Sequence, residues 1–316
     1  MNRGDLVNKG LIWKGQPGSD QPLPANRTII VSGLGRSGTS MVATLLAELG
    51  IISADDAYEE TLDDREFLHL LKFRQVDEFR TAIAQRNQRS SVWGFKLPSI
   101  HGYLEPPDLL AFRNPRLVIT VRDVVAVAER HAIAEHADPL LSFFEAADGL
   151  ADLIRFLRAV ICPTLLVSYE KAVSLHDEFI TALCQFCGCP IDDALRDRLA
   201  AIIHPNKLEY ARTARRRYDG NIDGMFNGNL VGWCREIGEA APVRLDLLVD
   251  GEIRSSFLAG QSRDDLKRAG IGDGSHGFTA STEGLGIIPA SILSVRVSGR
   301  TFEIPGSGKA AWEYWR

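Results

Sequence analysis

The sequence predicts an α/β protein in which helices flank a parallel sheet, followed by a small C-terminal antiparallel β-domain. Two observations predict the first part. Short continuous apolar runs are typical of strands that are buried on both faces, and helical patterns alternate with these runs. A third observation predicts the second part, because beyond Arg212 glycines become dense and apolar residues alternate with polar ones beside tight turns. The 316 residues suit two domains.

The predicted elements of the parallel sheet begin at Thr28. The first strand contains the β-branched run 29–31, and a helix follows in which Met41, Leu45 and Leu49 share one face. Gly50 stands where a helix usually ends. Further strands are expected at about 90–96, 117–121 and 164–168, and further helices at about 124–135 and 144–160.

The C-terminal strands are predicted from alternation. Residues 243–249 alternate and lead into the turn Asp250-Gly251, and residues 293–297 alternate before a turn at 298–300. The expected organisation is an N-terminal extension (1–27), an α/β domain (28–211), a basic linker (212–222) and a β-rich domain (223–316).

Composition restricts the function. Hydrophobic residues make up 45% and charged residues 24%, so a core can form. The net charge of −5 argues against wholesale binding to nucleic acid. The first residues contain no apolar signal core and no segment is long enough to span a membrane, so we expect a cytoplasmic protein.

Five cysteines are expected to be reduced thiols rather than a disulfide framework. Three of them, Cys184, Cys187 and Cys189, lie at the end of a helical pattern that Gly188 should stop. No suitably spaced pair of cysteines or histidines supplies the remaining zinc ligands. We therefore expect buried thiols at a helix end rather than a metal site.

A glycine-rich loop joins the first strand to the first helix. The spacing G-x-x-x-x-G from Gly33 to Gly38 fits a Walker loop, but Thr39 stands where that loop requires lysine. A strand, glycine-rich turn and helix aim backbone N–H groups at an anion. The alternative is a turn that only links the two elements. The residues expected to bind an anion are Gly35, Arg36, Ser37, Gly38, Thr39 and Ser40.

Two more cations follow predicted strands. Lys96 closes the second strand, and Arg122 follows the third strand just before a helix begins. Ligands of open parallel sheets bind beyond the carboxyl ends of the strands, so both cations should lie near the glycine-rich loop. Two separate anion pockets suit a ligand with phosphate at both ends better than a triphosphate.

These motifs together resemble those of sulfotransferases that use 3′-phosphoadenosine 5′-phosphosulfate (PAPS). The similar segments are G-L-G-R-S-G-T-S (33–40), W-G-F-K-L-P (93–98), V-R-D (121–123) and L-V-S-Y-E (166–170), in the family's order. The R-S-G-T-S loop resembles the bacterial, carbohydrate-type branch.

The resemblance implies a role for each cation. The loop would bind the 5′-phosphosulfate, Arg122 the 3′-phosphate, and Lys96 would assist the leaving group, with no metal required. Arg36 then takes the place of the missing Walker lysine. This sequence departs from the family at Arg130, where a serine that holds the 3′-phosphate is usual, and at Ser99, where an arginine is usual. Either Arg130 reaches the 3′-phosphate with its longer side chain, or that contact comes from elsewhere in the chain.

The general base is expected in the acidic segment 58–68, which resembles the family's segment after the first helix. Alignment on 65–68 selects Asp63, whereas alignment on Tyr58 selects Glu59 or Glu60. His101 is a further candidate. An acidic first turn of a helix would explain the segment without any function.

The segments 228–233, 249–251, 263–266 and 274–278 resemble an accessory β-domain found beside bacterial glycan-modifying transferases. The sequence therefore predicts sulfation of a hydroxyl, on a carbohydrate or polysaccharide precursor. The alternatives are a P-loop kinase or NTPase, and a non-catalytic nucleotide-responsive binding protein. The basic run 212–217 would either contact the nucleotide or form a solvated linker.

Overall fold

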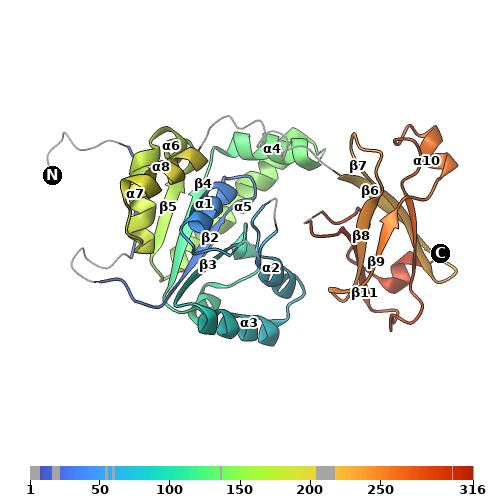
Figure 1. Cartoon of the computed structure of the whole chain (residues 1–316), viewed down its shortest axis with the longest axis horizontal. Helices are drawn as coiled ribbons and strands as arrows, with labels where there is room; N and C mark the ends of the chain where they lie inside the picture. Colours follow the sequence, from blue (N-terminus) through green and yellow to red (C-terminus); the bar gives the residue numbers. More distant parts are fainter. Residues whose placement is uncertain are drawn as a thin grey trace. The chain divides into compact units, whose positions relative to one another are not determined.

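The computed structural model describes residues 8–15, 22–53, 56–58, 61–135, 137–203, 218–300 and 302–315. The chain divides into two compact units, Met1–Ala214 and Arg215–Arg316 (Figure 1). The basic run 212–217 lies outside the described residues, so its role stays a prediction.

A five-stranded sheet forms the centre of the first unit, in the order β1-β5-β4-β2-β3. Four strands are parallel and lie where the sequence predicts them: β2 (Arg27–Gly33), β3 (Val92–Lys96), β4 (Pro115–Val121) and β5 (Thr164–Ser168). The strand β1 (Leu11–Lys14), which falls in the expected N-terminal extension, pairs antiparallel with β5 at the sheet edge.

Helices cover both faces of this sheet, as predicted, because successive side chains of a strand point to opposite faces. Ile29 and Val31 belong to one hydrophobic cluster, and Ile30 belongs to the other. The first face carries α1 (Thr39–Glu48), α6 (Tyr169–Ser174), α7 (His176–Cys187) and α8 (Asp193–Ile202). The second face carries α2 (Arg65–Lys72), α3 (Val76–Arg89) and α5 (Pro139–Ala159), with α4 (Val124–Glu135) against α5.

The helix α7 ends where the sequence predicts it, in the cysteine-rich segment. Gly188 ends the helix in the left-handed conformation, with a φ of 69°. Cys184 and Cys187 are buried, and burial raises the pKa of both thiols, that of Cys184 to about 11. Arg27 donates a 2.8 Å hydrogen bond to the carbonyl of Cys187, which caps this buried helix end.

The second unit consists of two antiparallel sheets around one hydrophobic cluster, which confirms the predicted β-rich part. The expected turn Asp250-Gly251 joins the strands 243–249 and 252–259. The first sheet contains β6 (Tyr218–Phe226), β7 (Asn229–Glu236) and β10 (Gly277–Ser281). The second sheet contains β8 (Val243–Val249), β9 (Glu252–Ala259), β11 (Ile292–Val297) and β12 (Lys309–Ala310), and the short helix α10 is Asp264–Arg268.

Candidate nucleotide-binding site

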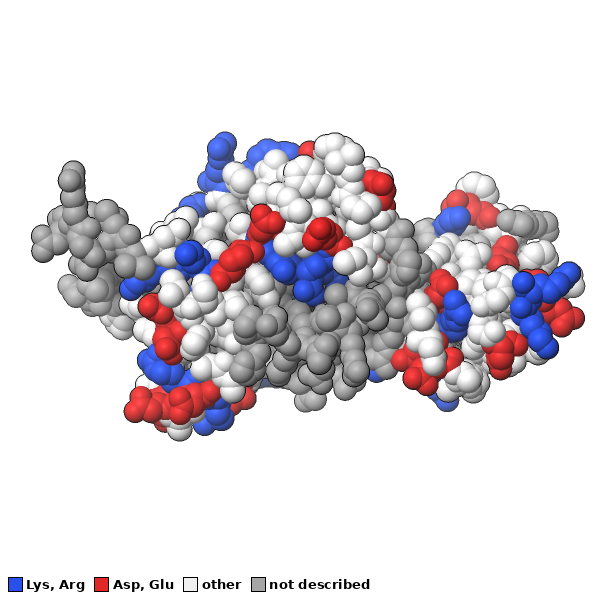
Figure 2. Space-filling view, turned by 90° about the horizontal axis from the view of Figure 1, so that it is seen from above, with Lys and Arg blue, Asp and Glu red and all other residues white. Residues whose placement is uncertain are grey.

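The candidate site lies at the carboxyl ends of three neighbouring strands. The central one, β2, leads into the glycine-rich loop, β4 leads to Arg122 and β3 ends at Lys96. The loop therefore lies between two cations that are distant in sequence. In Figure 2, the face of the first unit on which α4 lies carries a group of Lys and Arg side chains, bordered by Asp and Glu side chains.

The loop adopts a backbone that favours glycine at two positions. Gly33 has a φ of 149° and Gly38 a φ of 98°, and Arg36 between them is also left-handed, with a φ of 68°. Gly38 is the N-cap of α1, and no side chain caps this helix end. The first turn of α1 also contains no acidic residue. No side chain therefore neutralises the positive end of the α1 helix dipole, and an anion can bind there.

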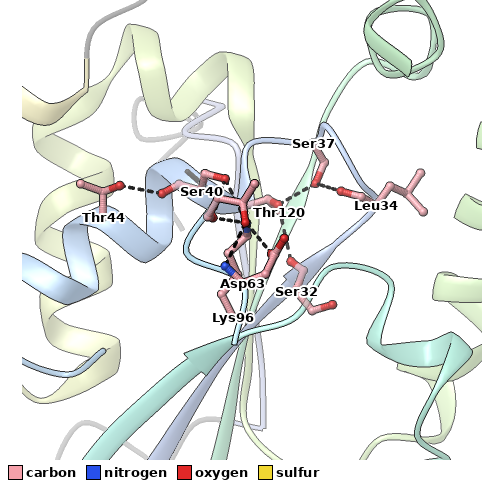
Figure 3. A network of polar contacts seen from close by, with 9 residues as sticks. Ser32, Leu34, Ser37, Ser40, Thr44, Asp63, Lys96 and Thr120 are labelled. Carbon is pink, nitrogen blue, oxygen red and sulfur yellow. Dashed lines mark hydrogen bonds and ion pairs between the residues drawn. The ribbon is translucent and has the colours of Figure 1, made fainter. Parts of the chain in front are cut away.

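A buried network of hydroxyl groups connects the loop to β4 (Figure 3). The Ser37 hydroxyl lies 2.8 Å from the Thr120 hydroxyl and donates a 2.7 Å hydrogen bond to the carbonyl of Leu34. A Cβ at Gly33 would overlap both Thr120 and Ser37. The sequence predicts Ser37 and Thr39 as anion ligands; both side chains are buried, and the Ser37 hydroxyl contacts Thr120 of β4 and the Leu34 carbonyl of the loop.

Lys96 is the most buried cation of the site, with 2% of its side chain exposed. Its ammonium group donates to the Ser40 hydroxyl at 2.9 Å and to the Thr61 carbonyl at 2.5 Å, and it lies 2.8 Å from a carboxylate oxygen of Asp63. Figure 3 shows Lys96, Asp63 and Ser40 converging beside the start of α1. Lys96 thus joins β3, the first helix and the acidic segment.

The charge of Lys96 is held in an unfavourable environment. Burial lowers the pKa of its ammonium group, the carboxylate of Asp63 opposes this change, and the charge of Arg36 adds a smaller lowering. The effect of Arg36 places both cations at the same end of the sheet. An anion bound here in addition to the Asp63 carboxylate would stabilise the positive charges of Lys96 and Arg36.

The segment that carries Asp63 is fixed to the end of β3. The amide of Asp64 donates a 2.9 Å hydrogen bond to the Lys96 carbonyl, and the amide of Tyr58 donates to the Asp63 carbonyl at 2.9 Å. Asp64 then caps α2 through a hydrogen bond from the amide of Phe67. The structure brings Asp63 to Lys96, whereas the alternative bases Glu59 and Glu60 lie outside the described residues.

Arg122 approaches the loop from the other side. Its guanidinium donates a 3.3 Å hydrogen bond to the Arg36 carbonyl and lies 4.6 Å from the centre of the Tyr169 ring. A carboxylate oxygen of Glu170 lies 3.9 Å from Arg122 Nε and accepts a 3.0 Å hydrogen bond from the amide of Asp123. Arg122 is therefore held beside the loop, as its place after β4 predicts.

The two other predicted residues are less closely tied to this cluster. Arg130 lies in α4, two turns beyond Arg122, and is half-buried. His101 lies in a short 3₁₀ segment (Ile100–Gly102), and burial lowers the pKa of its imidazole. Among the hydrogen bonds and ion pairs of the described residues, none joins His101 to Lys96 or Asp63.

Two residues of the cluster were not predicted from the sequence. Thr120 supports the loop through its hydroxyl, and Thr61 accepts from Lys96 through its carbonyl. A hydroxyl near the end of a predicted apolar strand was a usable signal for Thr120. A backbone carbonyl leaves no signal in the residue type.

Among the residues that the structure describes, no group of three or more His, Cys, Asp and Glu side chains is arranged to hold a metal ion. Across the same described ranges, no helix combines the length and the apolar character that crossing a membrane requires.

Comparison with known proteins gives likenesses of fold only. No family model and no curated protein matches the chain. The sulfotransferase domain of the Synechococcus PCC 7002 olefin synthase is 18% identical, with a TM-score of 0.39, over 64% of this chain and 97% of that one. Retinol dehydratase in complex with androsterone and the inactive cofactor PAP is 17% identical, with a TM-score of 0.37, over 61% and 71%. A sulfotransferase from Mycobacterium avium is 14% identical, with a TM-score of 0.36, over 58% and 70%.

Proposed function

We propose that this protein is a sulfotransferase that moves a sulfuryl group from PAPS to a hydroxyl group. One observation carries the proposal: the uncapped start of α1 and Arg122 lie at the ends of neighbouring strands and are joined through the Arg36 carbonyl. Two anion sites that share one loop suit a nucleotide with separate 5′ and 3′ anionic groups. The ordered motifs of the sequence support the same donor.

In this proposal the cations act on the leaving group. The acceptor oxygen attacks sulfur, the bond from sulfur to the 5′-phosphate oxygen breaks, and its electron pair remains on the phosphate. Arg36, Lys96 and the first turn of α1 would stabilise that growing charge. Lys96 already donates to the Ser40 hydroxyl at the loop. In this proposal the phosphate takes the place of one of the present partners of the Lys96 ammonium group.

Asp63 is our proposed general base, and it would take the proton of the attacking hydroxyl. Its carboxylate lies 2.8 Å from Lys96 and remains 15% exposed. The base must reach the acceptor hydroxyl, which attacks sulfur on the side opposite the leaving phosphate oxygen. Arg122, together with Arg130 in α4, would hold the 3′-phosphate.

For the acceptor we propose a carbohydrate or polysaccharide precursor. The proposal depends on the R-S-G-T-S loop at 36–40, which resembles the carbohydrate-type branch, and on the second unit, which resembles a domain found beside glycan-modifying transferases. Radiolabelled sulfate transfer from PAPS to a panel of oligosaccharides, phenols and sterols tests it. Transfer to phenols or sterols alone would contradict a glycan acceptor while leaving the donor proposal intact.

Calorimetric titration with adenosine 3′,5′-bisphosphate, and then with ATP and magnesium, tests the donor. We expect metal-free binding of the bisphosphate that falls by about ten- to a hundredfold in Arg36→Ala and in Arg122→Ala, because each removes charge-assisted hydrogen bonds. Arg80→Ala is the matched control, since that arginine lies in α3 with 68% of its side chain exposed.

The other outcomes separate the alternatives. A preference for ATP with magnesium would overturn the sulfotransferase proposal and favour a kinase or NTPase. Binding of neither nucleotide would favour a protein that acts by holding a partner. An equal loss in Arg80→Ala would show that the effect is a general one of surface charge.

A further inference from the structure

The second unit exposes two large aromatic side chains in the segment that follows β12. Trp312 and Trp315 are 59% and 51% exposed, whereas Trp93 in β3 is 6% exposed. A tryptophan side chain is large and mostly apolar, so it is normally well buried. These two residues, which we call the tryptophan pair, therefore leave a considerable apolar surface in contact with water.

The backbone places both rings on one side of this segment. Ala311–Tyr314 is a 3₁₀ helix, and the amide of Trp315 donates a 3.3 Å hydrogen bond to the Trp312 carbonyl. Side chains three residues apart eclipse each other in this type of helix, at a spacing of about 6 Å along its axis. Ala311 and Tyr314 are buried, so they occupy the side toward the core. The tryptophan pair consequently shares an outward side.

The segment is held by other parts of the second unit. The Tyr314 hydroxyl contacts the carbonyls of Leu293 and Gly306, and the indole N–H of Trp315 donates a 2.9 Å hydrogen bond to the sulfur of Met225. The only polar atom of the Trp315 ring is therefore used within the unit, and the exposed part of the ring is carbon. A surface that is fixed in advance loses little conformational entropy when it binds a ligand.

The size of this surface favours a small ligand over a protein. The backbone amide of Trp312 donates to the carbonyl of Pro289, which follows Ile288, a residue that is 60% exposed. The tryptophan pair and Ile288 together present roughly 400 Å² of apolar surface. A stable protein interface needs about 800 Å² from each partner. The surface thus suits a ligand of a few rings.

A chain of pyranose rings has the matching chemistry. When the substituents of a pyranose are equatorial, its two faces consist of C–H groups and its hydroxyls lie around the edge. One face can then stack on an indole while the edge stays hydrated. The spacing of about 6 Å between the two tryptophans is close to the length of one pyranose residue. The exposed carboxylate of Glu313, between them in the sequence, can accept a hydrogen bond from an edge hydroxyl.

We propose that Trp312 and Trp315 stack successive sugar rings of a glycan, and that the second unit thereby holds the acceptor. The inference deepens the proposed function, because it assigns the acceptor to chains of equatorially substituted pyranoses. It rests on the proposed function for the fate of the glycan. The binding step needs no donor and is measured without PAPS.

The probes are cellohexaose and chitohexaose, titrated into the full chain and followed through the indole N–H signals in NMR spectra. Each signal is assigned by its loss in a Trp→Phe variant. We expect the signals of Trp312 and Trp315 to shift, with a dissociation constant of about a millimolar. Trp312→Ala should weaken binding about tenfold or more, because one stacking ring is lost. Leu258→Ala is the matched control, since this residue is 51% exposed on β9, at the opposite edge of the second sheet from β12.

Two results would overturn the inference. In the first, neither oligosaccharide shifts the two signals, or Trp312→Ala binds as well as Leu258→Ala. In the second, light scattering shows a mass that rises with concentration in the wild type but not in Trp312→Ala, which would assign the surface to a second copy of the chain. Melting temperatures show whether each variant is folded when it is titrated.

Sulfate transfer separates the inference from the proposed function. In Trp312→Ala the KM for an oligosaccharide acceptor should rise about tenfold, while kcat and the affinity for adenosine 3′,5′-bisphosphate stay unchanged. If the wild type binds the probes through the tryptophan pair but transfers no sulfate from PAPS to any acceptor, the proposed function is wrong and the glycan site stands. If transfer occurs and the KM is unchanged in Trp312→Ala, the bound glycan is not the acceptor and the inference alone is overturned.

Discussion

Two buried ion pairs lie side by side in the first unit and are built differently. Asp64 pairs with Arg86, and 4% and 5% of the two side chains are exposed. Asp63, the preceding residue, pairs with Lys96, where 15% of the aspartate side chain remains exposed. Both pairs lie at the carboxyl end of β3, yet only the second faces the glycine-rich loop through Ser40.

The surroundings of each pair explain the difference. Arg86 contacts both carboxylate oxygens of Asp64, reaches Glu66 at 3.0 Å and lies 4.0 Å from the centre of the Phe67 ring. Lys96 has a point charge that any nearby anion can share, and its remaining partners are one hydroxyl and one carbonyl. The first pair fixes α2 and α3 to each other. In the proposed function, the second pair exchanges its carboxylate for a phosphate.

The largest expected effect comes from removing the exchangeable carboxylate. Asp63→Asn keeps the size of the side chain and should reduce the rate of sulfate transfer by about a hundred- to ten-thousandfold, because a neutral amide cannot accept the proton. Steady-state transfer from PAPS measures it. Because Lys96 is buried and loses its charged partner, urea unfolding should also become easier, and the rate is therefore measured on protein shown to be folded.

Asp77→Asn provides the control for Asp63→Asn, because that aspartate lies in α3 with 94% of its side chain exposed. Glu59→Gln, Glu60→Gln and His101→Gln test the other candidate bases in the same assay. A large loss in one of these, with Asp63→Asn fully active, would move the base to that residue.

The second largest effect should separate stability from turnover. Asp64→Asn breaks the buried pair and leaves Arg86 with the half-exposed Glu66 as its carboxylate partner, so unfolding should become easier by up to about 3–5 kcal/mol. Urea denaturation followed by circular dichroism measures the change, and hydrogen exchange in α2 and β3 locates it. Binding of adenosine 3′,5′-bisphosphate to the remaining folded protein should be unchanged. An Asp64→Asn variant as stable as the wild type would show that this pair does not stabilise the packing of α2 against α3.

The fold of the first unit was largely predictable because each of the four parallel strands is largely buried on both faces. Such strands are continuous apolar runs, and β5 lies at the very residues that the pattern indicates. The edge strand β1 was not predicted, because it has only four residues and Ile12 is largely exposed. A short strand with little buried surface has no distinctive pattern, and its pairing with β5 depends on tertiary contacts.

The candidate site was predictable where a residue type and a strand end coincide. Arg36, Lys96 and Arg122 could be chosen in this way, because cations after parallel strands meet at one edge. The partners of these cations could not be predicted from the sequence. The pairing of Lys96 with Asp63 depends on how residues 58–64 are held against β3, and the packing of Tyr169 on Gly38 depends on two segments far apart in the chain.

The smallest of these effects concerns pH and tests the claim that Lys96 is poised for exchange. Burial disfavours the charged ammonium, so its pKa lies below the ordinary 10.5. The proposed mechanism needs the protonated form, which is lost as pH rises through that lowered pKa. We therefore expect kcat/KM to fall on the alkaline side with a midpoint below 10.5, by about tenfold for each further unit of pH.

Lys96→Arg sharpens this test, because a guanidinium keeps its charge across the whole range. The variant should be slower at neutral pH, since its planar group does not reproduce the three donors of an ammonium, but its alkaline decline should move to higher pH. An unchanged decline in Lys96→Arg would assign the titration to another group. In that case the pair of Lys96 and Asp63 would resemble the pair of Arg86 and Asp64, and it would hold the segment in place without exchanging partners.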